Sequence, residues 1–227
     1  MTITPNILEE TSRGIQSYAI EDMMLKNREI FLTSAINDQS AVDTIKQLMY
    51  LDHKSADPVT IYINSPGGSV ISGMAIYDYI RLMRSPVTTV CVGTAASMGA
   101  ILFLSGSRRM MLPHSKVMIH DPYFGGTAMA GQKPLELKEK LNDLMETRKM
   151  LAEVIVEQTG MSKRQVLNFT KKDTFFDAKE ALKVGIATEI LGESPKSPSS
   201  GEGDGFRPVG KEEIPFSGPP LTAASRV

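Results

Sequence analysis

The stretch VTTVCVGTAASMGAILFLSG, residues 87–106, joins an apolar run, a turn of small residues and a second apolar run. The first run is rich in β-branched residues, which is typical of a strand. Between Gly93 and Gly99 almost no side chain except that of Met98 is larger than a methyl group, so the backbone there can approach another segment closely. The stretch therefore predicts a buried strand at 87–93, a sharp turn holding the hydroxyl of Ser97, and a buried helix at 97–106.

The alternation of strands and helices continues on both sides of this stretch. Strands are predicted at 28–33, 59–64, 116–120 and 186–191, and helices from about residue 38, at 73–83 and at about 134–158. Two shorter elements follow at 162–170 and 178–185. Since apolar strands that alternate with helices are typical of parallel sheets, the sequence predicts an α/β fold with both faces of the sheet covered.

The composition excludes several classes of protein. The chain has 227 residues, a formal net charge of −1 and no basic block. This balance disfavours binding to nucleic acids or to membrane surfaces. No apolar run approaches the ~20 residues that span a bilayer, and the N-terminus has acidic residues where a secretory signal would be basic and apolar. We therefore expect a cytoplasmic protein, in which the single cysteine, Cys91, is a packing residue.

Two changes in composition divide the chain. Residues 1–20 are mixed and weakly patterned, whereas residues 192–227 consist largely of proline, glycine and serine. The second composition cannot bury enough apolar surface to offset its ordering entropy, so we expect disorder there. The sequence predicts an N-terminal segment at 1–20, one domain at 21–191 and a C-terminal tail at 192–227.

Three predicted strands end in residues suited to catalysis, and in parallel α/β proteins such ends share one edge of the sheet. These residues are the pair Gly67-Gly68, Ser97 and His120. The glycines are able to supply backbone N–H groups to an oxyanion hole. The same sequence, SPGG, is also that of a simple tight turn, and both interpretations stay open at this point.

Ser97 stands in the segment Ala-Ala-Ser-Met-Gly, which has the features of a nucleophile elbow. Small neighbours permit a sharp turn between strand and helix, and the amides of the helix N-terminus face any developing negative charge. The first position departs from the usual G-x-S-x-G pattern. The alternative is a serine that caps a buried helix in a tightly packed corner.

Of the three histidines, only His120 is placed to serve Ser97 as a base. His53 lies at the polar end of a predicted helix and His114 in a turn. His120 instead ends an apolar strand at the same sheet edge as Ser97, whose hydroxyl needs a base to accept its proton.

A carboxylate is also required to hold the imidazole in the right tautomer. The candidates are Asp121, Asp173 and Asp177. Asp121 is too close in the chain to reach back to the ring of its neighbour, and the pattern does not choose between the other two.

Four segments together resemble the proteolytic subunit of the Clp protease, the ClpP family of serine peptidases. They are YINSPGGSVISGMAIYD (62–78), AASMGA (95–100), LPHSKVMIH (112–120) and KKDTFFDAKEALKVGI (171–186). The similarity extends from about residue 9 to residue 191. It implies a crotonase-like fold of repeated β-β-α units, in which the helix from Pro134 is a protruding handle that interlocks two seven-membered rings.

The resemblance also assigns roles to individual residues. It makes Ser97 the nucleophile, His120 the general base and Asp173 the acid of a catalytic triad. The further positions that match the family are Gly68 and Met98 for the oxyanion hole, Ser69, Val70, Gly125 and Gly126 for an extended peptide held by strand addition, and Tyr62 for docking of an unfoldase loop. No metal or organic cofactor is implied.

The implied activity is that of an endopeptidase that degrades unfolded proteins fed into its chamber by an AAA+ unfoldase. Residues 1–20 would be the axial segment of the ring. The chain would assemble as stacked seven-membered rings, either of identical subunits or mixed with a paralogue.

Three departures from the family pattern bear on activity. Asp121 replaces a glutamine that usually follows the base, Lys171-Lys172 replaces an Asp-Arg pair found in many members, and Pro134 lies early in the handle. These changes suit a second ClpP paralogue that works best in a mixed ring. The alternative is a conformationally inactive paralogue that structures or regulates an active partner subunit.

Two other activities of the same fold are disfavoured by the residues present. Crotonase-type acyl-CoA chemistry uses a glutamate, and no such carboxylate replaces Ser97 and His120. A Ser-Lys peptidase would need a lysine in place of His120.

Overall fold

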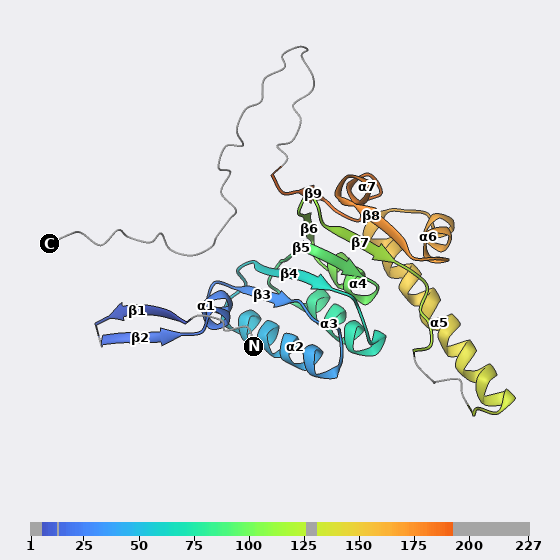
Figure 1. Cartoon of the computed structure of the whole chain (residues 1–227), viewed down its shortest axis with the longest axis horizontal. Helices are drawn as coiled ribbons and strands as arrows, with labels where there is room; N and C mark the ends of the chain where they lie inside the picture. Colours follow the sequence, from blue (N-terminus) through green and yellow to red (C-terminus); the bar gives the residue numbers. More distant parts are fainter. Residues whose placement is uncertain (1–5, 13, 126–130, 193–227) are drawn as a thin grey trace, which may run out of the picture.

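The computed structural model describes residues 6–12, 14–125 and 131–192. Gly126, and the predicted tail beyond residue 192, lie outside these ranges. Within them, a sheet of seven strands forms the centre of the molecule (Figure 1). Five strands are mutually parallel, in the order β3 (Glu29–Leu32), β4 (Val59–Ser65), β5 (Val87–Ala96), β6 (Arg108–Met111) and β9 (Glu189–Ile190). The predicted α/β class with a parallel sheet is confirmed.

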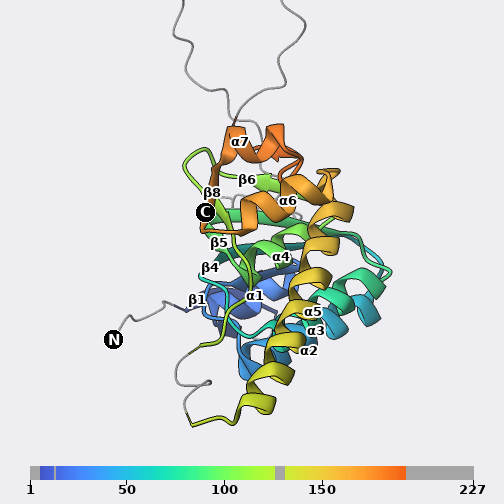
Figure 2. The same cartoon turned by 90° about the vertical axis from the view of Figure 1, so that its right-hand side faces the viewer.

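Most of the helices lie on one face of this sheet. Helices α2 (Asp38–Lys54), α3 (Val70–Leu82) and α4 (Met98–Leu104) pack side by side, and α5 (Pro134–Thr159) packs against α4 (Figures 1 and 2). Every residue of α4 is buried, as the apolar run predicted. The smaller helices are α1 (Ile20–Lys26) beside β3, α6 (Lys163–Thr170) beside α5, and α7 (Ala178–Lys183) beside β8 and β9.

The expectation that both faces of the sheet are covered is wrong for its β3–β4 part. Along β4, buried residues alternate with half-buried or exposed ones, which is the pattern of a strand with one face open. On β3, Phe31 is exposed. Cys91, in the middle of β5, is fully buried and serves packing as predicted.

Strand β5 divides between two neighbours along its length. Its first part, Thr88–Cys91, pairs with β6, and its end, Thr94–Ala96, pairs with β7 (Lys116–Ile119). At the division, the N–H of Thr94 donates to the side chain of Asn64, 3.0 Å away. Strand β7 then pairs antiparallel with β8 (Thr174–Asp177). Among the described strands, the β7–β8 ladder therefore pairs with the rest of the sheet through the end of β5 alone.

The N-terminal segment forms a hairpin that extends away from the domain (Figure 1). Its antiparallel strands are β1 (Ile7–Thr11) and β2 (Gly14–Tyr18). Leu8 and Ile15, with 69% and 74% of their surface exposed, have few apolar neighbours. No pattern in the sequence predicts this hairpin, because its strands bury almost nothing and so carry no apolar alternation.

Helix α5 is packed along only part of its length. Its buried residues, Leu151, Ala152, Val154 and Ile155, all lie in the C-terminal half. The N-terminal half extends beyond the sheet (Figure 2) and leaves Leu135, Leu141 and Met145 exposed. Pro134 occupies the first turn, where the missing N–H has no helical partner to lose. No helix among the described residues is long and apolar enough to cross a membrane.

Candidate active site

Ser97 lies in a sharp turn between β5 and α4 with a strained backbone. Its φ and ψ are 55° and −122°, a conformation that costs a non-glycine residue about 1–3 kcal/mol. Backbone hydrogen bonds hold it there: its N–H donates to the carbonyl of Met118 at 2.9 Å, and its carbonyl accepts from Ala100 at 2.9 Å. The side chain makes no capping hydrogen bond. Ser97 therefore occupies the N-cap position of α4 without using its hydroxyl as a cap, and the hydroxyl is left available for other chemistry.

The Gly67-Gly68 turn packs directly against the Ser97 turn. A Cβ atom on Gly67 would lie 2.6 Å from the carbonyl oxygen of Ala96 and 2.7 Å from the Cβ of Ser97. Gly67 and Gly68 also have φ values of 91° and 151°, which side chains disfavour. Both observations explain why glycine occupies these positions. The absence of side chains on the two glycines lets their turn lie directly against the turn that carries Ser97.

Two backbone N–H groups beside Ser97 are free to donate. Among the described residues, the N–H groups of Gly68 and Met98 have no hydrogen-bond acceptor. Met98 is the first residue of α4, where helix N–H groups have no intrahelical partner. The turn made by SPGG is thus both tight and able to present donors.

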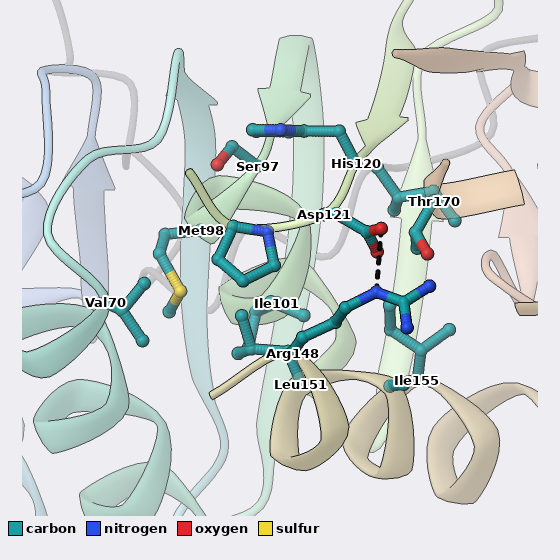
Figure 3. Close-up of a pocket in the computed structure, with 13 residues that line it drawn as sticks. Val70, Ser97, Met98, Ile101, His120, Asp121, Arg148, Leu151, Ile155 and Thr170 are labelled. Carbon is teal, nitrogen blue, oxygen red and sulfur yellow. Dashed lines mark ion pairs between the residues drawn. The ribbon is translucent and has the colours of Figure 1, made fainter. Parts of the chain in front are cut away.

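His120 lies one residue beyond the end of β7, at the same sheet edge as Ser97. The pairing of Ala96 with Met118 sets the ends of β5 and β7 side by side. Figure 3 shows the imidazole of His120 extending toward Ser97, and both residues line one pocket. The ring of His120 also contacts that of Tyr123, with centroids 5.5 Å apart. His53 and His114 are exposed elsewhere, as predicted.

The pairing of β7 with β8 places Asp173 opposite His120. The last paired residues are Ile119 and Thr174, so the next positions along this antiparallel register are His120 and Asp173. Both residues therefore lie just past the same end of the β7–β8 ladder. Asp173 is exposed. No hydrogen bond joins Ser97, His120 and Asp173 to one another in the described part of the chain.

The other two candidate acids are engaged elsewhere. Asp177 caps α7, where its side chain accepts from the N–H of Glu180 at 2.8 Å. The carboxylate of Asp121 forms an ion pair with Arg148 on α5, with 2.7 Å between Oδ2 and Nε. Of the three aspartates, Asp173 alone has no partner among the described residues.

A narrow pocket opens beside Ser97 and His120 (Figure 3), with an interior volume of about 30 Å³. Its walls are mainly aliphatic and come largely from α3, α4 and α5, and its polar members besides Ser97 and His120 are Asp121, Arg148 and Thr170. The apolar lining suits an uncharged side chain. The complete lining is Val70, Ser97, Met98, Ile101, Ile119, His120, Asp121, Pro122, Arg148, Leu151, Ala152, Ile155 and Thr170.

The residues assigned to peptide binding are only partly at this pocket. Val70 lines it. Ser69 caps α3, where its hydroxyl oxygen accepts from the N–H of Ser72 at 3.2 Å. Gly125 is exposed with open space around it, and Gly126 lies outside the described residues. Among those residues, no group of three or more histidine, cysteine, aspartate or glutamate side chains is arranged to hold a metal ion.

Tyr62 lies away from the pocket, on the open face of the sheet. Its ring stacks on that of Phe31, with centroids 4.8 Å apart, and its hydroxyl donates to Oε1 of Glu29 at 3.0 Å. Burial, and then the bond to Glu29, raise the pKa of Tyr62 to about 12.

This shift predicts a loss of stability in alkali. The unfolded tyrosine ionises near its ordinary pKa of about 10, whereas folded Tyr62 keeps its proton up to a pH of about 12. The stabilisation from Tyr62 is complete below the pKa of the unfolded tyrosine, about 10. It is lost as the pH rises from there through the folded pKa of about 12, because in this window the unfolded state binds fewer protons than the folded state. Urea unfolding on both sides of this window should show a smaller pH dependence for Tyr62→Phe than for the wild type. If the free energy of unfolding changes with pH equally in the two proteins, Tyr62 is not the source of the loss.

Two residues of the pocket had no signal in the sequence. Arg148 is one of many charged residues on a long helix, and Thr170 is one hydroxyl near the end of a short one. Their place in the pocket beside His120 depends on how α5 packs against α4 and α6. Only a contact between distant segments identifies them.

Comparison with protein-family models matches residues 12–194 to the family described as Clp protease. The matched range covers most of the chain. It contains both turns, the β7–β8 ladder and every residue that lines the pocket.

Proposed function

Because the chain belongs to the Clp protease family, we propose that it is a serine endopeptidase with Ser97 as the nucleophile. The observation that carries this proposal is the uncapped hydroxyl of Ser97, held in a strained turn in the wall of the same pocket that His120 lines. Strain of this kind persists only where the surrounding structure enforces it, and such sites are commonly functional.

The proposed reaction follows the positions of these groups. His120 accepts the proton of Ser97 as Oγ attacks the peptide carbonyl carbon, and then gives that proton to the leaving amine. The N–H groups of Gly68 and Met98 stabilise the negative oxygen of the tetrahedral intermediate. Water, deprotonated by His120, hydrolyses the acyl-enzyme. Asp173, just before β8 on the side of His120, keeps the imidazole in the tautomer that this requires.

We assign substrate binding to the segments on either side of Ser97. An extended peptide adds as a strand along Ser69-Val70 and Gly125-Gly126, with one side chain in the aliphatic pocket. The position of Val70 in the pocket wall supports this assignment.

The proposal extends to assembly. Residues 21–191 are the peptidase domain with a crotonase-like fold, residues 1–20 the axial segment and residues 192–227 a tail. Helix α5 is the handle between stacked seven-membered rings, and the exposed apolar residues on its projecting half, Leu135, Leu141 and Met145, support burial against another subunit. An AAA+ unfoldase docks at Tyr62, beside the exposed Phe31. The proposed location is the cytoplasm.

Hydrolysis of an unfolded protein tests the proposed function. The assembled protein is incubated with quenched fluorescent casein, and with a tagged folded substrate in the presence or absence of an AAA+ Clp unfoldase and ATP. We expect slow cleavage of casein by the chain alone, and degradation of the folded substrate only with unfoldase and ATP. Absence of cleavage under every condition would contradict the proposal.

A second candidate function is favoured by the absence of hydrogen bonds among Ser97, His120 and Asp173 in the described structure. The chain would then be a subunit that shapes a mixed ring, and Lys171-Lys172, both exposed, would face a paralogue rather than a copy of itself. Labelling of Ser97 only after mixing with the paralogue would support this function.

A further inference from the structure

The residue that follows the base is tied to α5 by an ion pair. We propose that the pair between Asp121 and Arg148 is a positioning device that holds His120 in line with Ser97. This inference rests on the proposed function, since it concerns the same base and nucleophile.

Asp121 is anchored at two points. Its carboxylate Oδ2 lies 2.7 Å from Nε of Arg148, and its backbone N–H donates to the carbonyl of Thr170, 2.7 Å away. The first contact holds it to α5 and the second to the end of α6. Both act on the residue bonded directly to His120.

His120 has few other restraints. It lies past the end of β7, and residues 121–125 have no regular secondary structure. Among the described residues its ring has no hydrogen bond, and its aromatic neighbour, Tyr123, is itself 73% exposed. The position of the imidazole is therefore set mainly by the backbone that carries it, and that backbone is fixed at Asp121.

The ion pair is sheltered enough to act as a restraint. The side chains of Arg148 and Asp121 are 24% and 30% exposed, and both line the wall of the pocket (Figure 3). Charge-assisted contacts of this kind are shorter and stronger than neutral hydrogen bonds. An exposed pair, by contrast, typically contributes little.

Arg148 is held on a rigid part of its helix. It lies about one turn before Leu151 and Ala152, which are buried against the domain. The backbone that carries its side chain is therefore held in place. An ion pair between this helix and Asp121 can therefore hold the neighbouring His120 in place. Accurate placement matters, because a displacement of about 1 Å can lower a rate about 10²-fold.

The test compares Arg148→Gln, Asp121→Asn, the double variant and Arg148→Lys with the wild type. The measurements are the labelling rate with a fluorescent fluorophosphonate from about pH 5 to about pH 9, kcat and KM for a short peptide, and the fraction folded by circular dichroism. We expect each single neutral variant to lose about 10-fold or more in labelling rate and kcat, with KM nearly unchanged. The double variant should lose no more than either single one, since the two residues act as a unit. Arg148→Lys should recover part of the rate.

Lys163→Gln is the matched control, because it removes a different ion pair of α5, the one between Glu153 and Lys163 of α6 at 3.2 Å. It should label like the wild type. Equal Ser97-dependent labelling in all variants would overturn the inference. So would a rise in KM with kcat unchanged, or a loss of rate in the double variant equal to the product of the two single losses. Losses of rate that only follow the fraction folded would overturn it as well. Wild-type labelling that is absent, or that persists in Ser97→Ala, would overturn the proposed function and the inference with it.

Discussion

Under the proposed function, Ser97→Ala is expected to abolish labelling by a fluorescent fluorophosphonate and to lower peptide hydrolysis by a factor of about 10⁴ or more, as loss of the nucleophile does in characterised serine peptidases. The turn should survive the change, because Ser97 is held by backbone hydrogen bonds to Met118 and Ala100 rather than by its hydroxyl. Labelling is measured on gels, alongside the elution volume of the oligomer.

The control for this experiment is Ser107→Ala. Ser107 is exposed and donates to the carbonyl of Val87 at 3.0 Å, far from the pocket in the fold. It should label at the wild-type rate. If Ser97→Ala labels as fast as Ser107→Ala, another residue is the nucleophile.

Asp173→Asn is expected to reduce kcat about 10⁴-fold, because an amide no longer selects the imidazole tautomer that leaves the nitrogen facing Ser97 free to accept a proton. The side chain is exposed and the substitution keeps its shape, so folding should be unchanged. Steady-state hydrolysis of a short peptide gives kcat, and urea unfolding gives the stability.

Asp177→Asn provides a matched comparison four residues further along the chain. Asparagine caps helices as well as aspartate does, so the contact with Glu180 at the start of α7 is retained. This variant should keep nearly full activity. A large loss in Asp177→Asn and none in Asp173→Asn would show that the acid is assigned to the wrong end of β8.

The part of the site that the sequence predicts best is the part formed by neighbours in the chain. The strand, turn and helix of residues 87–106 follow from β-branched residues, small residues and an apolar run in direct succession, and the structure has all three. Ser97 needed no distant contact to be recognised. Its uncapped side chain, however, is visible only in the structure.

The parts that were missed depend on contacts between distant segments. Strands β6 and β8 have four residues each, and their sequences, RRMM and TFFD, do not alternate clearly. Without β8 there is no register to place Asp173 opposite His120, and so the sequence pattern left two aspartates open. The pair of Asp121 with Arg148 likewise depends on where α5 lies.

The division of β5 between two neighbours has a consequence for how the site can change state. His120 and Asp173 adjoin the last pair of the β7–β8 ladder, whereas Ser97 and the Gly67-Gly68 turn follow β5 and β4 of the main sheet. The two parts meet where β5 pairs with β7 and where the N–H of Ser97 donates to the carbonyl of Met118, so a movement of the ladder that changed the distance from His120 to Ser97 would have to break these contacts. Under the proposed function, the alignment of base and nucleophile thus depends on the seam where the end of β5 meets β7.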